Sequence, residues 1–445
     1  MVIKDMLGVI YAPHKTFKKI ADNPKYLAVA IIILLFIALQ SIYYYNCCSK
    51  INCEQTLPPV NQLSAFTSSG VASSDDPQII NQWTITHGAD ITENKQDYIN
   101  QTFYGANSLQ FVLTKGNSLS ASLEQFGYTA NCSSGGFTSL NMHIKQTSPN
   151  VVPNSGTLTL YTANSTSSYF THDITAELTK NLGSWNNLTI PVGDNALGWQ
   201  ATGSPNWSEV TGLKLSVTYP SSSSDVSILL QGIFFRGQFL TQTNVLGTWM
   251  FFWYYSLSIC IQATLQWIIL AAVAYLLLKV LKVNNIVWKP IIATVGYALM
   301  SIVITSVFFV LSSLTLPTIS CPYDLPFSFV AYSDAIINSA SPSSQVLYEA
   351  VTAETATFAN LTIVISIFMY VLQIIFITFA VKAVSGCTYV KNIIQTTSYD
   401  DTKTIETVNV NTNQELSYVK CFIIAVITVI ATMFLLSLLA GLGVF

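Results

Sequence analysis

Five long hydrophobic stretches that contain no charged residue and no histidine constrain the fold of this chain more than any other feature. Of its 445 residues, 51% are hydrophobic and only 9% are charged, against roughly 25% charged residues in average soluble domains. Each stretch can supply the ~20 apolar residues that a bilayer-spanning helix needs. The stretches cover residues 26–49, 249–278, 291–323, 355–381 and 421–445. The sequence therefore predicts a membrane bundle of five helices.

The spacing of these stretches predicts the order of the domains. We expect transmembrane helices at 26–46, 249–279, 291–314, 355–381 and 421–443. Between them we expect a cytoplasmic amphipathic segment at 1–25, an extracellular linker at 47–80, an extracellular β-sandwich at 81–240, an extracellular loop at 315–354 and a cytoplasmic loop at 382–420. The first span starts more than twenty residues from Met1 and no A-x-A-like cleavage site follows it, so a retained anchor is predicted.

The positions of the lysines predict the orientation, because cytoplasmic segments retain Lys and Arg close to the spans. Twelve of the eighteen lysines lie in three short segments: Lys4, Lys15, Lys18, Lys19, Lys25, Lys279, Lys282, Lys289, Lys382, Lys391, Lys403 and Lys420. This places the N-terminus in the cytoplasm, and the large insert and the C-terminus outside the cell. A multi-pass protein of the cell membrane is predicted.

Glycosylation sequons and cysteines agree with an oxidising exterior for the insert. The sequons are Asn100, Asn131, Asn164, Asn187, Asn206 and Asn360. The cysteines expected outside, and therefore candidates for disulfides, are Cys47, Cys48, Cys53, Cys132 and Cys321. Five is an odd number, and the sequence does not determine the pairing: Cys47 or Cys48 could bridge to Cys53 or Cys321.

The insert has the pattern of an all-β domain. From Trp83 to Arg236, eight short alternating runs such as QWTITHG, GTLTLYT and GLKLSVTY recur between turn signals. Period-two alternation without a long helical pattern predicts a β-sandwich or jelly roll. The fold class is therefore a membrane α-helical bundle with an inserted all-β ectodomain.

The cytoplasmic segment 1–25 has two interpretations. Met6, Leu7 and Ile10 share a helical face, and Phe17 and Ile20 lie on a second short helix after Pro13. Such helices can lie among lipid headgroups with their lysines facing anionic lipid. They can equally pack on the spans of the same protein. Both interpretations remain open.

The predicted membrane part resembles the Yip1 domain family. The resemblance rests on Pro13, Phe17, Ile20 and Pro24 before the first span, on the Trp267-to-Tyr275 helix leading through Lys279 and Trp288-Lys-Pro290 into Gly296-Tyr297-Ala298, and on five spans with a cytoplasmic N-terminus. It covers residues 1–46 and 249–445, and this chain departs from the family by its long insert. The resemblance implies a small helical bundle without catalytic residues, linked in eukaryotes to membrane trafficking.

The insert resembles the galactose-binding-like jelly rolls of carbohydrate-binding modules, through Trp185 before a strand, Trp199 and Trp207 in the next loop, and a long strand that ends at Phe235-Arg236. Flat aromatic faces match the apolar face of a pyranose. Trp199, Trp207 and Tyr169, with Trp185, are therefore candidates for a sugar-stacking platform. The alternative is that these side chains pack in the core.

Other chemistry has weaker support in the sequence. Asp173, Asp194 and Glu209 are the carboxylates that a structural calcium ion would use, but no dense Asp-x-Asp pattern accompanies them, and no other cofactor or metal is expected. His87, His143 and His172 lie on different predicted strands, and no nucleophile or metal motif is found, so we expect a protein that is not an enzyme. With a net charge of −3 and one arginine, no nucleic-acid partner is expected.

Three functions follow from these patterns. The first is a surface protein, of archaeal type, whose glycosylated sandwich binds glycans, cell-envelope proteins or another subunit. The second is a Yip1-like membrane-organising scaffold capped by the sandwich. A small-solute transporter is disfavoured, because the spans lack ionisable groups. Membrane lipids are expected partners in each case, and a homo- or hetero-oligomer is compatible with all three.

Overall fold

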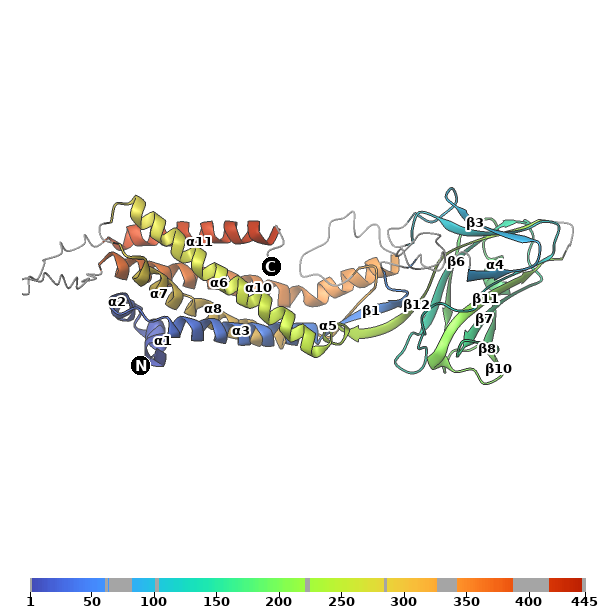
Figure 1. Ribbon diagram of the computed structural model, residues 1–445, viewed down its shortest axis with the longest axis horizontal. Coiled ribbons are helices and arrows are strands. Elements are labelled where there is room, and N and C mark those ends of the chain that lie inside the picture. Colours follow the sequence, from blue (N-terminus) through green and yellow to red (C-terminus); the bar gives the residue numbers. More distant parts are fainter. Residues whose placement is uncertain are drawn as a thin grey trace, which may run out of the picture. The chain divides into compact units, whose positions relative to one another are not determined.

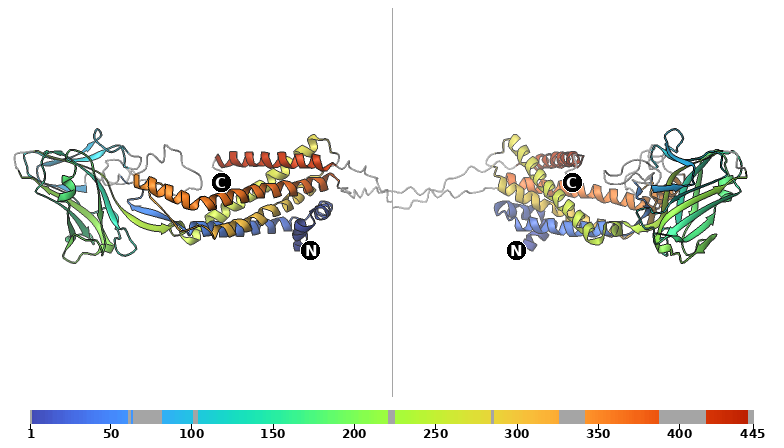
Figure 2. Two further views of the ribbon diagram at one scale, coloured as in Figure 1. Left: turned by 180° about the vertical axis from the view of Figure 1, so that it is seen from behind. Right: turned by 45° about the vertical axis from the view of Figure 1, so that its right-hand side comes forward.

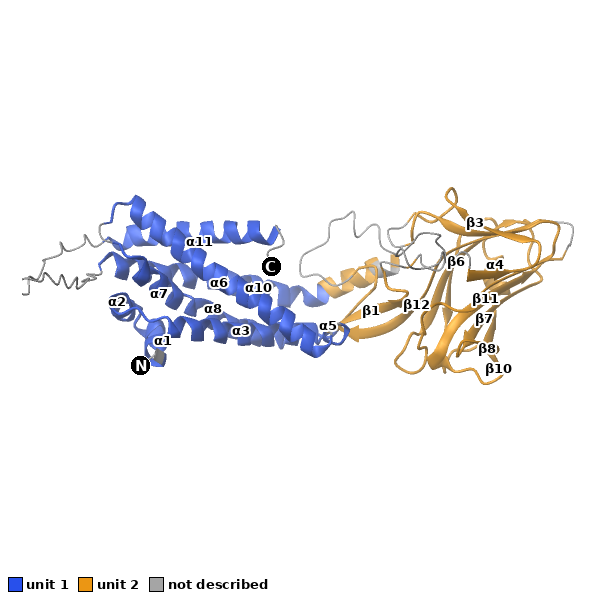
Figure 3. Cartoon of the chain, viewed as in Figure 1, with its two compact units in different colours: residues 1–50, 242–318, 353–445 blue, residues 51–241, 319–352 orange. Residues whose placement is uncertain are grey.

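The computed structural model describes residues 2–60, 63, 82–100, 104–220, 225–283, 286–325, 342–386 and 416–441. The chain divides into two compact units, which Figure 3 shows in different colours. One unit consists of residues 1–50, 242–318 and 353–445, and the other of residues 51–241 and 319–352. Most of the predicted linker at 47–80 and of the predicted cytoplasmic loop at 382–420 lies outside the described residues. We describe each unit by itself.

The second unit is built on two β-sheets. The seven-stranded sheet has the order β13-β1-β12-β4-β3, with β6 on the other side of β12 and β9 beyond β6 (Figure 1). All its pairs are antiparallel except the parallel pair β1–β13. Its strands are β1 (Ile51–Leu57), β3 (Ala89–Asn94), β4 (Ser108–Leu113), β6 (Ser139–Ser148), β9 (Asn186–Pro191), β12 (Val226–Thr241) and β13 (Ile319–Cys321).

The second sheet of this unit has six antiparallel strands in the order β10-β8-β7-β11-β5-β2. Its strands are β2 (Trp83–Ile85), β5 (Ser118–Leu123), β7 (Ser155–Thr162), β8 (Ser165–Asp173), β10 (Trp199–Thr202) and β11 (Val210–Thr218). A short helix, α4 (Thr175–Thr179), follows β8, and a 3₁₀ turn, Trp207–Glu209, precedes β11.

One hydrophobic core lies between the two sheets. Alternate residues of β4, β6 and β12 from one sheet and of β5, β7 and β11 from the other form a single buried cluster, which includes Phe111, Leu140, Ile228, Leu160 and Leu215. Because side chains alternate between the two faces of a strand, this pattern leaves one face of each sheet pointing away from the core. The predicted β-sandwich is confirmed in this form.

The first unit is a bundle of long apolar helices, which run side by side in the views of Figures 1 and 2. Five helical segments in its described part are long and apolar enough to cross a membrane. Its helices are α1 (Val2–Tyr11), α2 (Pro13–Asp22), α3 (Leu27–Cys48), α5 (Gln242–Leu246), α6 (Thr248–Val280), α7 (Trp288–Ala298), α8 (Met300–Ser313), α10 (Pro342–Ser385, whose first residues belong to the other unit) and α11 (Tyr418–Gly441).

The segment formed by α7 and α8 is the centre of the bundle. In its apolar 18-residue window 78% is buried, against 28–33% in the corresponding windows of the other four segments. A β-carbon on Gly296 would lie 2.5 Å from a methyl group of Val29 and 2.9 Å from Nε1 of Trp267, so glycine lets α7 approach α3 and α6 closely. Trp267 in turn donates a hydrogen bond of 2.8 Å to the carbonyl of Ile292.

Polar contacts tie α3 to α8 along their length. Gln40 donates to Oγ of Ser306 at 2.9 Å, and Asn46 donates to Oγ of Ser313 at 3.1 Å. The ammonium of Lys50 donates to the carbonyls of Ser313, Leu314 and Leu316 at 2.7–3.2 Å. Ser313 is the last residue of α8 and Leu314 is its C-cap, where a helix has unpaired acceptors and a negative dipole end. Lys50 therefore caps this helix.

The sequence placed the helices more accurately than it placed the exposed segments. The predicted spans agree with α3, α6, α7–α8 and α11 to within three residues, but α10 begins thirteen residues before the predicted span at 355. The predicted loop at 315–354 accordingly contains β13 and the start of α10. The predicted linker at 47–80 contains β1, a strand of the seven-stranded sheet. Strands β1, β3, β5, β10 and β13 are additional to the eight predicted runs.

Candidate functional site

The outer face of the six-stranded sheet carries an array of hydroxyl groups. The register of the strands puts the side chains that point away from the core on this one face. Apart from Lys214, Asp173 and Gln200 they are hydroxyl-bearing: Thr84, Ser118, Ser120, Ser122, Thr157, Thr159, Tyr161, Tyr169, Thr171, Thr202, Ser216 and Thr218. Such a surface offers many hydrogen-bond donors and acceptors and little charge.

Two tyrosines lie at the β8 side of this face. Tyr161 on β7 is opposite Tyr169 on β8, with ring centroids 6.3 Å apart in an edge-to-face arrangement. Tyr161 is buried and Tyr169 is half-buried. Burial, with contributions from Glu124 and Tyr169, raises the pKa of Tyr161, so its hydroxyl is neutral at physiological pH. An aromatic surface is thus held in a fixed orientation beside the hydroxyl groups.

The neighbouring edge of the sheet surrounds Tyr169 with polar groups. Thr202 on β10 is opposite Tyr169, and Gln200 is opposite Thr171. Asp173 is exposed and follows on the same face. The hydroxyl and the amide of Thr175 donate to its carboxylate at 2.5 and 2.9 Å, and these bonds lower the pKa of Asp173. We call Tyr169, Thr171, Asp173, Gln200 and Thr202 the Tyr169 patch.

The two tryptophans of the predicted platform lie on the opposite side of the sheet. Trp207 is 8% exposed and stacks on Phe170, with centroids 3.9 Å apart and planes 8° apart. Trp199 packs edge-on against Trp207 and donates from Nε1 to the carbonyl of Pro191. Trp199 is paired with His172, which is three residues from Tyr169, so the two aromatic side chains point to opposite faces. The prediction that Trp199, Trp207 and Tyr169 form one platform is wrong.

The other predicted site residues are separated. The indole of Trp185 donates to Asp97. Asp194 and Glu209 are exposed, like Asp173, and the described part of the chain brings no three His, Cys, Asp or Glu side chains together as a metal site. The sequon asparagines are all exposed: Asn100, Asn131, Asn164, Asn187, Asn206 and Asn360. Glycosylation and calcium binding stay predictions.

No disulfide is recorded among the described cysteines. Cys47 and Cys48 end α3, and Cys132 is buried in the core of the sandwich. Cys53 and Cys321 lie opposite each other on β1 and β13. This last juxtaposition is not apparent from the sequence, because β13 was expected to be a loop.

A charged cluster inside the second unit was also missed. Glu54 on β1 is 5% exposed and forms a two-point ion pair with Arg236, the only arginine in the chain. Its carboxylate also accepts from the amides of Gly237 and Tyr323, at 3.1 and 3.2 Å. The guanidinium lies 4.8 Å from the ring centre of Tyr323, whose hydroxyl is 3.2 Å from that of Tyr104. All acceptor positions of Glu54 are occupied, which is typical of a structural ion pair.

Of three comparisons with known proteins, only the one with solved structures gives matches. No protein-family model and no curated protein sequence matches the chain. Among solved structures, a β-1,2-glucanase from Parabacteroides distasonis aligns at 15% identity and a TM-score of 0.26, over 35% of this chain and 22% of the glucanase. An exo-β-agarase aligns at 12% identity and a TM-score of 0.28, over 40% and 26%. A carbohydrate-binding module of the β-sandwich superfamily aligns at 13% identity and a TM-score of 0.22, over 36% and 58%.

These matches contradict one prediction from the sequence. The expectation that the protein is not an enzyme is withdrawn, because the aligned structures include a β-1,2-glucanase and two agarases. The chain spans about a quarter of the length of the first two, 22% and 26%.

Proposed function

We propose that this protein is a multi-pass membrane protein whose β-sandwich binds glycans on the outside of the cell, through the Tyr169 patch. The observation that carries the proposal is the position of Tyr169. Its ring lies on the sheet face that points away from the core, between Tyr161 and the polar side chains of β8 and β10. A pyranose presents an apolar face and a rim of hydroxyl groups, and this surface offers a partner for each.

The composition of the patch favours a neutral glycan over a charged one. Thr171, Gln200 and Thr202 can each donate and accept hydrogen bonds without charge. Asp173 carries the only formal charge of the patch, and it would repel an anionic sugar. Tyr169 and Thr171 are half-buried, so these two side chains lose less rotamer freedom on binding than fully exposed ones would.

The membrane topology is part of the proposal. The five apolar segments support insertion, and the twelve lysines near their ends support a cytoplasmic N-terminus with the sandwich outside. Because the first and second spans flank the sandwich, both its ends are anchored to the membrane.

The test is glycan binding by the full-length protein in lipid nanodiscs. An array of neutral and anionic oligosaccharides identifies ligands, and calorimetry then compares variants. We expect Tyr169→Ala to weaken binding at least tenfold, a loss of about 1.4 kcal/mol. Tyr98→Ala, on the segment that crosses the other sheet, is the matched control and should bind like the wild type. Mass spectrometry of the same incubations would detect shortened oligosaccharides if the protein hydrolyses them.

Two results would contradict the proposal. One is an array without any bound glycan when the nanodisc protein is folded. The other is a glycan whose affinity is the same for Tyr169→Ala and for the wild type, which would place binding elsewhere on the sandwich.

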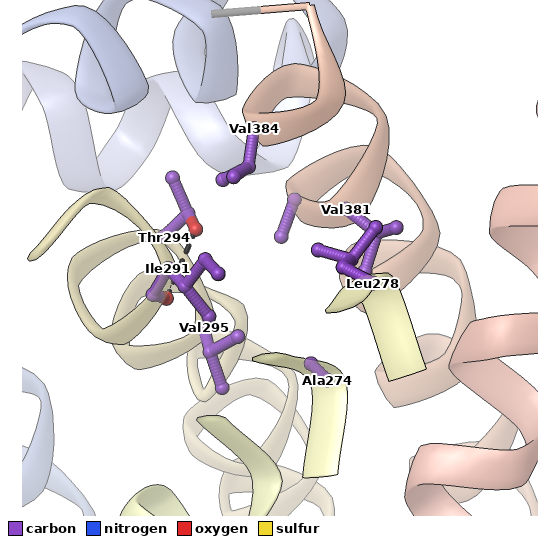
Figure 4. A pocket seen from close by; sticks show the side chains of 8 residues that line it. Ala274, Leu278, Ile291, Thr294, Val295, Val381 and Val384 are labelled. Atoms are coloured by element: carbon purple, nitrogen blue, oxygen red, sulfur yellow. Dashed lines mark hydrogen bonds between the residues drawn. The ribbon is translucent and has the colours of Figure 1, made fainter. Parts of the chain in front are cut away.

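A second candidate function is that of a membrane-organising scaffold, as the resemblance to the Yip1 family implies. It is favoured by the seam between α6, α7 and α10 in Figure 4, where the side chains leave no room for a water molecule. The seam is lined by Ala274, Leu278, Ile291, Thr294, Val295, Ala380, Val381 and Val384. Such packing suits a rigid support better than a solute path along this seam. Replacing residues 51–241 by a short linker distinguishes the candidates, because a scaffold should still insert and keep its membrane partners.

A further inference from the structure

Cys53 and Cys321 are direct neighbours in the seven-stranded sheet. Strands β1 and β13 run parallel, and their register pairs Ile51 with Ile319, Asn52 with Ser320 and Cys53 with Cys321. Adjacent strands lie about 4.8 Å apart. Disulfides join residues whose α-carbons are about 4.4–6.8 Å apart. The two cysteines therefore meet the distance requirement without movement of the backbone.

The two side chains also lie on the same side of the sheet. Ile51, Ile319, Cys321 and Val351 form one hydrophobic cluster, and Cys53 packs against it. Paired residues of adjacent strands point to the same face. Both sulfur atoms are thus directed into one small apolar environment in which a disulfide can be buried.

The two thiols differ in access. Cys321 is 2% exposed, whereas Cys53 is partly exposed and lines a cavity of about 420 Å³ together with Thr56, Pro322 and Tyr323. Burial raises the pKa of the Cys53 thiol, so most of it is protonated at neutral pH and its reaction is slow without a catalyst. Because Cys53 is the more exposed of the two thiols, an oxidant reaches it first.

We propose that Cys53 and Cys321 form a disulfide that cross-links β13 to β1. The oxidant is a disulfide donor, either a thiol-oxidising protein or oxidised glutathione. The Cys53 thiolate attacks one donor sulfur and releases the other as a thiolate, giving a mixed disulfide. The Cys321 thiolate then attacks Sγ of Cys53 and releases the second donor thiolate. Two cysteine thiols are oxidised by two electrons in total, and the donor is reduced to two thiols, which take up through solvent the two protons that the cysteines lose.

The bond would close a loop that contains residues 54–320. A cross-link over so long a loop strongly restricts the unfolded chain, which stabilises the folded state. It would also fix β13, which has only three residues and one partner strand in the described structure. The proposed disulfide is independent of glycan binding, since both cysteines lie outside the Tyr169 patch.

The test is peptide mapping of the full-length protein from native membranes. Thiols are blocked with N-ethylmaleimide, and the protein is digested with trypsin and chymotrypsin without reduction. We expect a linked peptide pair that contains residues 53 and 321 and separates on reduction. Purified protein is also equilibrated with reduced and oxidised glutathione, and oxidised glutathione should produce the same pair.

Variants make the result decisive. Cys53→Ser and Cys321→Ser should each abolish the link, whereas Cys132→Ala, in the sandwich core, should keep it. Reductant should lower the melting temperature of the wild type by several degrees and leave the Cys53→Ser/Cys321→Ser protein unchanged. The proposal is overturned if Cys53 or Cys321 is linked to Cys47 or Cys48, or if both stay alkylatable in excess oxidised glutathione while the protein is folded.

Discussion

Glu54 and Arg236 form a buried two-point ion pair between β1 and β12, with Nε to Oε1 at 2.7 Å and Nη2 to Oε2 at 3.0 Å. Planar guanidinium and carboxylate groups match in this geometry, which gives directional hydrogen bonds in addition to charge attraction. The Glu54 side chain is 2% exposed, so its charge is stabilised almost entirely by protein groups.

The first prediction concerns this ion pair. Glu54→Gln removes the charge partner of Arg236 and should lower the free energy of unfolding of the sandwich by about 3–5 kcal/mol. Arg236→Lys keeps the charge but loses the two-point contact, so it should cost less. Hydrogen exchange of β1 and β12 would measure the effect. Lys95→Gln, which breaks an exposed pair of 3.5 Å with Glu93, is the control and should change stability by less than about 1 kcal/mol.

The second prediction concerns His143 on β6 and the pH dependence of stability. Burial lowers the pKa of His143 from 6.5 to about 4, although a hydrogen bond to the backbone of Gln231 opposes the shift. Between these values the unfolded chain binds a proton that the folded chain does not. Stability therefore falls as the pH drops from about 6.5 to 4, by up to about 3 kcal/mol, and this contribution is constant above pH 7.

Thermal unfolding of the sandwich at several pH values would measure this dependence. His143→Gln should flatten the curve between pH 6.5 and 4. His87→Gln is the matched control, because His87 is exposed, and it should keep the slope of the wild type. An unchanged slope in His143→Gln would mean that other groups cause the acid sensitivity.

The third prediction distinguishes the structural role of Trp207 from the proposed glycan-binding role of Tyr169. Trp207→Ala removes the stack on Phe170 and leaves a cavity, so it should cost about 3–5 kcal/mol of stability. Its folded fraction should still bind glycans with the affinity of the wild type. Denaturant unfolding and calorimetry together check this. A large affinity loss in folded Trp207→Ala protein would argue against the Tyr169 patch.

The fourth prediction concerns α1. Met6 and Val9 pack into the bundle, while Ile3, Leu7, Ile10 and Tyr11 are 44–70% exposed. Asp5 pairs with Lys19 at 2.5 Å and holds α1 against α2. We expect the exposed face to lie among lipid headgroups, since apolar side chains and lysines favour an anionic surface.

An environment-sensitive fluorophore at Ile10→Cys, in a variant without other reactive cysteines, would test this in nanodiscs. Its emission should shift to the blue more strongly with anionic lipid than with zwitterionic lipid, and salt should reduce the difference. The same label at Asn23→Cys, an exposed position at the end of α2, is the control. Equal emission at both positions would indicate that α1 faces water.

Of the two interpretations of the N-terminal segment, packing on the helices of the same protein is seen for Met6, Val9, Phe17 and Ile20, and contact with lipid headgroups stays a prediction. The sequence identified the apolar residues of α1, but it could not divide them between the bundle and the outside. Met6 is buried and Leu7 is exposed, although they are adjacent and equally apolar. Only the neighbouring helices decide which side of α1 is covered.

The sequence by itself determined the elements. In a long run of uncharged apolar residues, a helix satisfies the backbone hydrogen-bonding groups within the segment itself. Alternation of apolar core residues, such as Leu160 and Leu215, with polar neighbours predicts strands. Both patterns are local properties of the chain. The tertiary structure alone decided which residues meet. Trp199 and Tyr169 point to opposite faces of their sheet because of the register between β10 and β8. Glu54 reaches Arg236, as Cys53 reaches Cys321, because β1 pairs with strands from distant parts of the chain. Such pairing depends on the packing of the whole sheet, which no local pattern encodes.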